Sequence, residues 1–295
     1  MKIGIDVGGT QVKIGFVEGK NIVHKFAIDT NKETLFDEVC VFVKQKIEEL
    51  NITNLEGIGI GVPGNIISGY ITLLPNVGIR NFDLHKKMKE YFPNTVIGSG
   101  NDANVAALGE ALIKDIKNAI FVTLGTGVGG GVIVNGKVIE GITGSGGEIG
   151  HMQVDNKYNF QCGCGLKGCL ETLASATGIV RLCNTYMPQY PNSILYGKEV
   201  TCKDVIDAAK VNDELGLLAL NEACDSLARA LSLLAVTTNP DSFIIGGGVS
   251  KAGDILIDTI KKYYDNYAYF GVKNTKIELA TLGNDAGILG AAFLV

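Results

Sequence analysis

Apolar and polar residues alternate with a period of two along the first thirty residues, which is the pattern of half-buried β-strands. The alternating positions are Ile3, Ile5 and Val7, then Val12, Ile14 and Phe16, and finally Ile22, His24, Phe26 and Ile28. Gly8-Gly9-Thr10 and Gly19-Lys20 separate these runs. Because glycine-rich segments between apolar runs mark turns, we expect three strands in succession.

The apolar period then changes to that of an amphipathic helix between residues 34 and 50. Thr34 and Asp37 resemble a capping box at its start. A strand over 56–62, ending at Pro63-Gly64, and a helix opening at Asn101-Asp102 come next, so strands and helices mix along the chain. The later expected elements are strands over 119–124, 131–134 and 241–245, and helices over 213–238, after 250–254 and over 285–295.

The strand, turn and strand of the N-terminus return in the second half of the chain. Gly9-Thr10 with Gly19-Lys20 and Gly125-Thr126 with Gly136-Lys137 occupy corresponding places, displaced by 116 or 117 residues. A repeat of this length is too long for a solenoid. The pattern therefore indicates an internal duplication and predicts two related α/β domains that face each other.

The length of 295 residues also favours two domains. Polar residues cluster at 114–118, where we expect the boundary. The predicted domains are an N-terminal α/β domain over 1–116, joined by the closing helix 285–295, and a C-terminal α/β domain over 117–284.

Composition excludes several classes of protein. Hydrophobic residues make up 46% and charged residues 19%, which is a globular composition. The net charge is −5 without a basic block, so we expect no nucleic-acid partner. There is no apolar run of about 18 residues, so no membrane span is expected, and a strand that starts at once leaves no room for a signal peptide. Seven cysteines, an odd number, favour reduced thiols and a cytoplasmic location.

Glycine is unusually frequent, with 39 residues, and three glycine loops stand out. Glycines let backbone N–H groups approach phosphate oxygens, and a threonine hydroxyl adds a donor. Each loop taken alone could be a plain hairpin turn, but three loops, two of them in the duplicated frame, favour phosphate binding. The loops are Gly8-Gly9-Thr10, Gly125-Thr126-Gly127 and Gly246-Gly247-Gly248.

The segment 125–130 also matches the G-x-G-x-x-G pattern of dinucleotide-binding proteins. That fingerprint requires a helix directly after the glycines, so that the helix N-terminus meets the pyrophosphate. A strand is expected at Val132–Val134 instead, which excludes the dehydrogenase interpretation. The chain also lacks the G-x-x-x-x-G-K-[ST] motif of P-loop enzymes.

Two carboxylates are candidates for chemistry. Asp6 precedes the first glycine loop and could hold Mg²⁺ near phosphates, since hard cations take oxygen ligands; the alternative is an Asx turn. Asp102 opens a predicted helix, where it could be a general base for phosphoryl transfer to a hydroxyl or simply an N-cap. A helix N-terminus favours the ionised form that a base needs.

Three cysteines and a histidine form a third motif, His151-x₁₀-Cys162-x-Cys164-x₄-Cys169. A Cys₃His set fits tetrahedral Zn²⁺ with no open position, so the metal is expected to be structural. The alternative is that the thiols are buried as small hydrophobes, but the segment is rich in glycine. Glu148 and Glu171 flank the motif and could hydrogen-bond hydroxyls, or be a surface residue and an N-cap. The other four cysteines are expected to be core or incidental.

These motifs resemble the ROK family of sugar kinases and repressors over essentially the whole chain. The segments that carry the resemblance are Asp6–Thr10, Asn101–Asn104, Leu124–Gly127, Gly144–His151, Cys162–Glu171 and Ile245–Val249. The resemblance implies an α/β fold of two actin-like or hexokinase-like (ribonuclease H-like) domains around a central cleft. The sugar and phosphate side would lie in the N-terminal domain, and the zinc loop and nucleotide site in the C-terminal one.

The resemblance also implies ATP and Mg²⁺, structural Zn²⁺, a hexose substrate and a homodimer. Asp102 would be the general base, and His151, Cys162, Cys164 and Cys169 would hold the zinc. The sugar-binding positions would be Gly64, Asn76, Asn101, Asp102, Glu148, His151 and Glu171. The cofactor-binding positions would be Asp6, Gly8, Gly9, Thr10, Gly125, Thr126, Gly127, Gly246, Gly247 and Gly248. The chain has no tryptophan, which members often carry after the position of Asn76.

The expected reaction is transfer of the γ-phosphoryl group of ATP to the 6-hydroxyl of a hexose. The segments 246–254 and 282–287 look most like glucokinases, so glucose is the expected substrate. N-acetylmannosamine, fructose and N-acetylglucosamine kinases of the same family are the alternatives. A sugar-responsive repressor is disfavoured because no helix-turn-helix precedes Asp6, and an inactive scaffold because Asp6, Thr10, Asp102 and Thr126 are all present.

Overall fold

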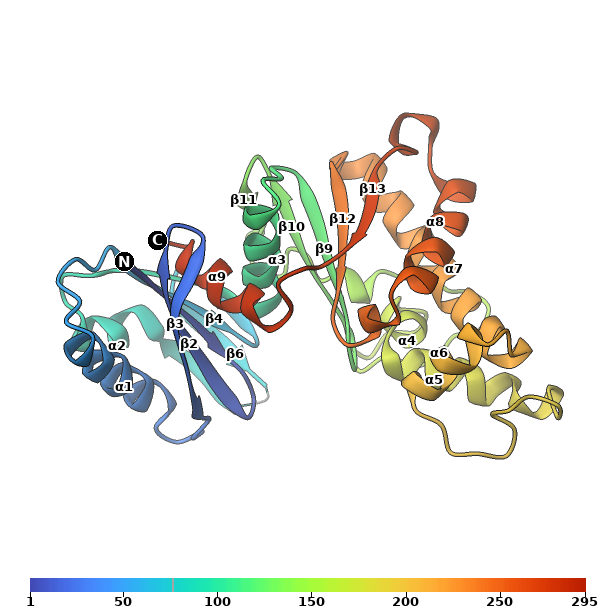
Figure 1. Ribbon diagram of the computed structural model, residues 1–295, viewed down its shortest axis with the longest axis horizontal. Helices are drawn as coiled ribbons and strands as arrows, with labels where there is room; N and C mark the ends of the chain where they lie inside the picture. Colours follow the sequence, from blue (N-terminus) through green and yellow to red (C-terminus); the bar gives the residue numbers. More distant parts are fainter. Residues whose placement is uncertain (76) are drawn as a thin grey trace. The chain divides into compact units, whose positions relative to one another are not determined.

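The computed structural model describes residues 1–75 and 77–295 (Figure 1). Two compact units make up the chain. Unit 1 comprises Met1–Lys117, Gly131–Gly147 and Leu282–Val295, and unit 2 comprises Asn118–Gly130 and Glu148–Thr281. Residues 131–147 group with unit 1, whereas the sequence-based boundaries assign them to the C-terminal half. The two domains over 1–116 and 117–284 stay a prediction.

Unit 1 is built on a five-stranded sheet with the order β3-β2-β1-β4-β8. β1 pairs antiparallel with β2 and parallel with β4, and β4 pairs parallel with β8. A smaller antiparallel sheet has the order β5-β6-β7. The elements are β1 (Lys2–Val7), β2 (Gln11–Glu18), β3 (Asn21–Asp29), α1 (Leu35–Glu49), β4 (Gly57–Val62), β5 (Asn65–Ile67), β6 (Tyr70–Leu74), β7 (Ile79–Asp83), α2 (Leu84–Tyr91), β8 (Val96–Asn101), α3 (Asp102–Ile113), β11 (Lys137–Val138), η5 (Gly283–Asp285) and α9 (Ala286–Ala292).

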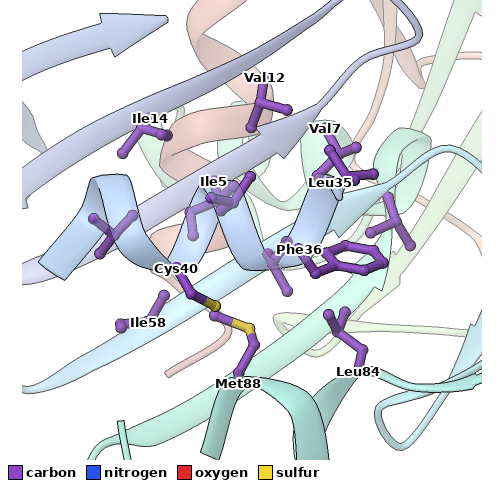
Figure 2. Close-up of a cluster of buried hydrophobic side chains, with 14 of the residues drawn as sticks. Ile5, Val7, Val12, Ile14, Leu35, Phe36, Cys40, Ile58, Leu84 and Met88 are labelled. Carbon is purple, nitrogen blue, oxygen red and sulfur yellow. The ribbon is translucent and has the colours of Figure 1, made fainter. Parts of the chain in front are cut away.

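One face of the first sheet is aliphatic because alternate residues of its strands are isoleucine or valine. Figure 2 shows Ile5, Ile14 and Ile58 of this face with Leu35, Phe36 and Cys40 of α1. Leu84 and Met88 of α2 pack into the same core. These residues are almost fully buried, so the amphipathic face of α1 and the strand alternation meet in one hydrophobic cluster.

The opposite face of the sheet is largely glycine, and α9 packs directly on its backbone (Figure 1). A Cβ added to Gly4 would lie 1.9 Å from the carbonyl oxygen of Ile288, and one added to Gly59 would lie 1.7 Å from that of Ala291. α9 also packs closely on α3, where a Cβ on Gly290 would lie 1.7 Å from the carbonyl oxygen of Val105. α9 therefore holds α3, which begins at Asp102, against the first sheet. Asp6 lies near the end of β1 in that sheet, just before the glycine turn.

A second sheet has the order β11-β10-β9-β12-β13, and the unit boundary falls within β10. β12 pairs parallel with both β9 and β13. The remaining elements are β9 (Ala119–Leu124), β10 (Val128–Val134), η1 (Ile149–His151), α4 (Glu171–Ala174), α5 (Ala176–Tyr186), η2 (Met187–Gln189), α6 (Cys202–Lys210), α7 (Glu214–Thr238), β12 (Ser242–Gly246), η3 (Val249–Ala252), α8 (Asp254–Tyr267), η4 (Phe270–Val272) and β13 (Lys276–Leu279).

Most elements that the sequence predicts are confirmed, including the three initial strands, the helices at 34–50 and 213–238 and the closing helix. The capping box at Thr34 is wrong, because the Thr34 hydroxyl donates to the Glu38 carboxylate instead of capping α1. The strand expected at 131–134 begins earlier, at Val128. Across the described residues, none of the helices is both long enough and apolar enough to cross a membrane.

Candidate functional site

The first glycine loop is a tight turn between β1 and β2. The N–H of Gly8 donates to the carbonyl of Gln11 over 2.9 Å, which closes the turn. Gly9 and Thr10 are exposed, and a Cβ added to Gly9 would meet no atom within 4 Å. The turn thus presents accessible backbone to solvent, as a phosphate-binding loop requires.

Asp6 lies at the end of β1, directly before this turn. Its carboxylate lies 3.8 Å from the ammonium of Lys13, which is its cross-strand partner on β2. Burial raises the pKa of Asp6, and the charge of Lys13 lowers it. A Cβ on Gly287 would lie 2.6 Å from the Asp6 carboxyl carbon, so the start of α9 supports this side chain.

The sequence analysis did not single out Lys13. A signal was available, because Asp6 and Lys13 stand at equal distances from the centre of the turn at 8–11, and antiparallel strands place such residues opposite each other. With a lysine beside the carboxylate, this end of β1 combines an oxygen ligand for a cation with a donor for an anionic group.

Asn101 and Asp102 lie where β8 ends and α3 begins. The side-chain oxygen Oδ1 of Asn101 accepts from the N–H groups of Ala103 (3.0 Å) and Asn104 (3.2 Å), so Asn101 is the N-cap. The alternative interpretation of Asp102 as the N-cap is therefore wrong. Asp102 is the first helical residue, and its Oδ1 accepts from the N–H of Ala103 over 2.8 Å. The positive end of α3 stabilises its ionised form.

Gly64 is brought to the same place. The Asn101 Nδ2 donates to the Gly64 carbonyl over 3.1 Å, which ties the segment between β4 and β5 to the start of α3. A Cβ on Gly64 would lie 2.3 Å from the carbonyl oxygen of Leu73, so only glycine fits. The structure therefore gathers Gly64, Asn101 and Asp102 in unit 1. Asn76, the other predicted sugar-binding residue of this part of the chain, lies outside the described residues.

The second glycine loop, in unit 2, is held by Glu171. The N–H of Gly125 donates to the carbonyl of Gly127 over 2.9 Å, and the N–H of Val128 donates to Glu171 Oε2 over 3.1 Å. A Cβ on Gly127 would lie 2.1 Å from the same oxygen. β10 follows the loop directly, as expected from the sequence, so the loop does not lead into a helix as the dinucleotide fingerprint requires.

The Cys/His motif forms a compact cluster, also in unit 2. The ligand atoms of His151, Cys162, Cys164 and Cys169 all lie within 4.8 Å of one another. Cys162 Sγ is 3.6 Å from His151 Nδ1, and Cys164 Sγ is 3.7 Å from Cys169 Sγ. Zn–S bonds of ~2.3 Å in a tetrahedron separate neighbouring sulfurs by roughly 3.7 Å, so the donor set fits this ion. A backbone N–H at Leu166 lowers the pKa of Cys164, whereas burial raises the pKa of Cys162 and of Cys169.

The cluster and the second glycine loop are neighbours. Glu171 Oε1 lies 3.7 Å from Cys162 Sγ, while its other oxygen accepts from Val128. A Cβ on Gly150, the residue before His151, would lie 2.1 Å from the Val128 carbonyl oxygen. The structure thus brings together the loop 125–127, His151 and Glu171, whereas Glu148 is an exposed residue at the start of η1.

The third glycine loop borders a cavity of about 240 Å³ in unit 2. Gly247 has φ of +84°, and a Cβ there would lie 2.5 Å from the carbonyl oxygen of Leu124, so the loop needs glycine at this position. The cavity has aliphatic walls and a charged rim, a combination suited to a flat, partly polar ligand. It is lined by Ala176, Cys202, Lys203, Ile206, Asp207, Lys210, Gly248, Val249, Lys251 and Ala252.

The α6 side of this cavity is not predicted from the sequence. The α6 residues lie 36 to 44 positions before Gly246 in the chain, and nothing in their local pattern distinguishes them from any amphipathic helix. The sequence predicts the other four cysteines to be core or incidental. Cys40, Cys183 and Cys224 are buried, whereas Cys202 is only partly buried and lines the cavity.

Comparisons with known proteins agree on one family. The model of the ROK family matches residues 2–295. A glucokinase of Halalkalibacterium halodurans is 40% identical over 99% of this chain and 94% of its own length. The structure of a ROK family glucokinase from Streptomyces griseus, in complex with glucose and AMPPNP, is 30% identical with a TM-score of 0.76, covering 100% of this chain and 98% of that one.

A ROK hexokinase structure from Thermus thermophilus is 29% identical with a TM-score of 0.86, covering 100% of this chain and 97% of that one. These neighbours confirm the α/β fold class of the actin-like and hexokinase-like type that the sequence predicts. The chain belongs to the ROK family.

Proposed function

We propose that this protein is an ATP-dependent hexose kinase that transfers the γ-phosphoryl group of ATP to the 6-hydroxyl of glucose. The observation that carries the proposal is the start of α3, where Asn101 caps the helix and leaves Asp102 at its positive end, beside Gly64. The name of the relative at 40% identity and the glucose-bound structure at 30% identity support glucose as the hexose.

In this mechanism Asp102 accepts the proton of the 6-hydroxyl as that oxygen attacks the γ-phosphorus, and the bond from the γ-phosphorus to the bridging oxygen breaks, so that ADP leaves. Phosphoryl transfer needs little covalent help from the protein beyond positioning, charge stabilisation and such a base. An ionised carboxylate at a helix N-terminus meets this need, because the helix dipole stabilises its charge. The remaining sugar contacts would come from Gly64, Asn76 and Asn101, and from Glu148, His151 and Glu171 of unit 2.

The glycine loops would bind the nucleotide through backbone N–H groups. Gly9 and Thr10 and, in unit 2, Thr126 and Gly127 would donate to phosphate oxygens. Gly8 and Gly125 would shape these loops, because their own N–H groups already donate to the carbonyls of Gln11 and Gly127. The cavity beside Gly246, Gly247 and Gly248 would take the base, which its aliphatic walls and charged rim support. Asp6 offers the oxygen ligand that Mg²⁺ prefers, and the ion would neutralise phosphate charge when bound.

We further propose that His151, Cys162, Cys164 and Cys169 hold a structural Zn²⁺, which the spacing of their ligand atoms supports. Four protein ligands leave no open position for substrate or water, so the ion would shape the loop that carries His151. A cytoplasmic homodimer is part of the proposal. It rests on the family resemblance, and light scattering of the purified protein would test the dimer.

The experiment that tests the function measures ADP release from ATP and Mg²⁺ with single sugars. The panel contains glucose, N-acetylmannosamine, N-acetylglucosamine, mannose and fructose, and Asp102→Asn is the control. We expect the highest kcat/KM with glucose and its loss in the variant. A strong signal with an N-acetylated sugar instead would correct the substrate, and no signal with any sugar from folded, zinc-loaded protein would contradict the kinase assignment.

A further inference from the structure

The loop between His151 and Cys162 makes contacts that the proposed chemistry does not use. Its ten residues, 152–161, carry no metal ligand, and a loop of this length without helix or strand is expected to move. Instead, the aromatic rings of Tyr158 and Phe160 are part of a side-chain cluster with α5 and α7, here called the Tyr158 cluster. Its members are Lys157, Tyr158, Phe160, Arg181, Tyr186 and Glu222.

Tyr158 is at the centre of the cluster. Its ring stacks on Phe160, with centroids 5.2 Å apart and an interplanar angle of 12°. It also meets the ring of Tyr186 on α5 edge to face, with centroids 6.2 Å apart, and the two hydroxyls are hydrogen-bonded. Both are favoured geometries for aromatic pairs. The ring of Tyr158 therefore joins the loop to α5.

Two cations extend the cluster. The Lys157 ammonium lies 4.8 Å from the Tyr158 ring centroid and 2.7 Å from Glu222 Oε1 on α7. The Arg181 guanidinium lies 5.2 Å from the Phe160 ring centroid, and its NH1 donates to the Thr172 carbonyl over 2.8 Å. Since Thr172 follows Glu171 in α4, the cluster connects the loop with α4, α5 and α7.

The backbone of the loop is also ordered at this point. The Asp155 carboxylate accepts from the N–H groups of Lys157 (2.8 Å), Tyr158 (3.1 Å) and Asn159 (3.0 Å). Over half of the Lys157 side chain is exposed, at 56%, so its ion pair with Glu222 contributes little alone. Backbone hydrogen bonds join both ends of the loop to the segment 166–170, for example from Leu170 N–H to the Met152 carbonyl and from Gly168 N–H to the Phe160 carbonyl. The rings supply most of the attachment of the loop to α5.

We infer that the Tyr158 cluster is a metal-independent clamp, which fixes the loop of the metal centre on α4, α5 and α7, and that Tyr158 is a positioning residue for His151. The clamp reduces the motion of the loop between two ligands, so it slows metal release. It also holds His151 and Glu171 in place for the hexose, and this second consequence rests on the proposed function.

The test compares zinc release from the full-length, zinc-loaded protein into an excess of a chromogenic chelator. Tyr158→Ser removes both ring contacts, and Tyr158→Phe keeps them. Tyr196→Ser is the control for loss of a tyrosine ring in unit 2. Tyr196 is exposed, whereas Tyr158 is half-buried, and the described residues record no aromatic pair or cation–π contact for the Tyr196 ring. We expect release to be roughly tenfold faster in Tyr158→Ser, since each aromatic pair contributes to the barrier, and unchanged within about twofold in the other two.

A second measurement separates positioning from general damage. Hexose KM is expected to rise several-fold in Tyr158→Ser while kcat stays near the wild-type value. Lys157→Met, a milder change, is expected to release zinc at an intermediate rate, and the urea midpoint of each variant reports on folding. Release from Tyr158→Ser within twofold of wild type, or equally fast release from Tyr196→Ser, would overturn the clamp.

The two proposals can fail separately. Fast zinc release from Tyr158→Ser in a protein without kinase activity would leave the clamp standing and contradict the function. A wild-type protein that is an active kinase but binds no zinc would overturn the clamp, because the metal that it is inferred to retain would not be there.

Discussion

Asn101 and Asp102 are neighbours with separate tasks. Asn101 caps α3 through two backbone N–H groups and holds the carbonyl of Gly64. Because Asn101 satisfies these donors, the helix does not depend on Asp102 for its cap. The Asp102 side chain can therefore change without loss of the helix, which makes it a suitable position for testing chemistry apart from stability.

For Asp102→Asn we expect kcat to fall by about 10²–10⁴-fold, the usual contribution of a general base. Hexose binding, measured by calorimetry, is expected to stay within about threefold because the shape of the side chain is kept. The matched change Asn101→Ala removes the cap and is expected to lower the free energy of unfolding by about 1 kcal/mol. Turnover of Asp102→Asn within tenfold of wild type would contradict the assignment.

His85 is a second residue with an individual consequence. Its Nε2 lies 2.9 Å from Ser99 Oγ on β8, and burial lowers the pKa of His85 below its ordinary value of 6.5, against the smaller effect of Asp83. The unfolded chain then binds a proton more readily than the folded one. Stability therefore rises with pH through the window below 6.5 and is lost as the pH falls through it.

His85→Gln keeps a hydrogen-bonding partner for Ser99 but does not titrate. We expect the urea midpoint of the wild type to fall more steeply than that of the variant as the pH is lowered from 7 to 5. The reason is that the His85 imidazole gains a proton on unfolding, whereas the glutamine side chain of the variant does not. Parallel pH profiles for the two proteins would exclude His85 as the source.

Among the elements, α9 has the closest packing. It lies on the glycine face of the first sheet and on α3, in contact with backbone on both sides. Such contacts leave no space for a methyl group, and an overfilled interface shifts backbone. α9 thereby determines where Asp6 and Asp102 lie within unit 1.

Gly59→Ala is expected to lower the free energy of unfolding by about 1–3 kcal/mol, because its Cβ would collide with the carbonyl oxygen of Ala291. Gly9→Ala is the control, since a Cβ there meets nothing within 4 Å. Denaturant unfolding followed by circular dichroism measures both. Equal stability of the two variants would contradict the close packing of α9.

The sequence predicts the helices and strands better than it predicts the tertiary contacts between them. Alternating Ile3, Ile5 and Val7 predict β1 because period two is a local property. The glycine face against α9 could not be predicted, since its partner is about 230 residues or more away in the chain. The predicted helix cap at Thr34 is wrong for a local reason, because the Thr34 hydroxyl donates to the Glu38 carboxylate and does not accept from a backbone N–H of α1.

The candidate site divides in the same way. The ligands of the metal centre were predictable because one short segment carries three of them and donor chemistry limits the choice. The roles of Asn101 and Asp102 were not, since either side chain suits a helix start and only the hydrogen bonds decide. Lys13 and the α6 wall of the cavity depend on pairing between segments, which a single sequence does not reveal.

At the scale of the whole molecule, the proposed zinc would act on unit 2 alone. All four ligands and the adjoining loop 125–127 belong to that unit. Removing the ion removes the link between three thiols and an imidazole, so the segment around Cys162, Cys164 and Cys169 loses a constraint that the Tyr158 cluster does not supply.

We expect elemental analysis to give about one zinc per chain in protein that was purified without a chelator. Treatment with a strong chelator is expected to lower Tm by several degrees and to raise hexose KM, and added zinc should restore both. A Cys164→Ser variant gives the same comparison without chelator. Metal-free protein with wild-type Tm and KM would contradict a structural role.

The position of α9 in the chain also bears on how the protein is made. The ribosome releases β1 and β4 early, but α9 follows only after residues 148–281 of unit 2 have been synthesised. Until then the glycine strip of the first sheet has no covering layer, and a nascent chain in this condition is open to association with others. Unit 2 can thus complete its fold first. A chain whose translation stops before Leu282 lacks α9, so we expect chaperones or proteases to bind it and we expect no catalytic activity.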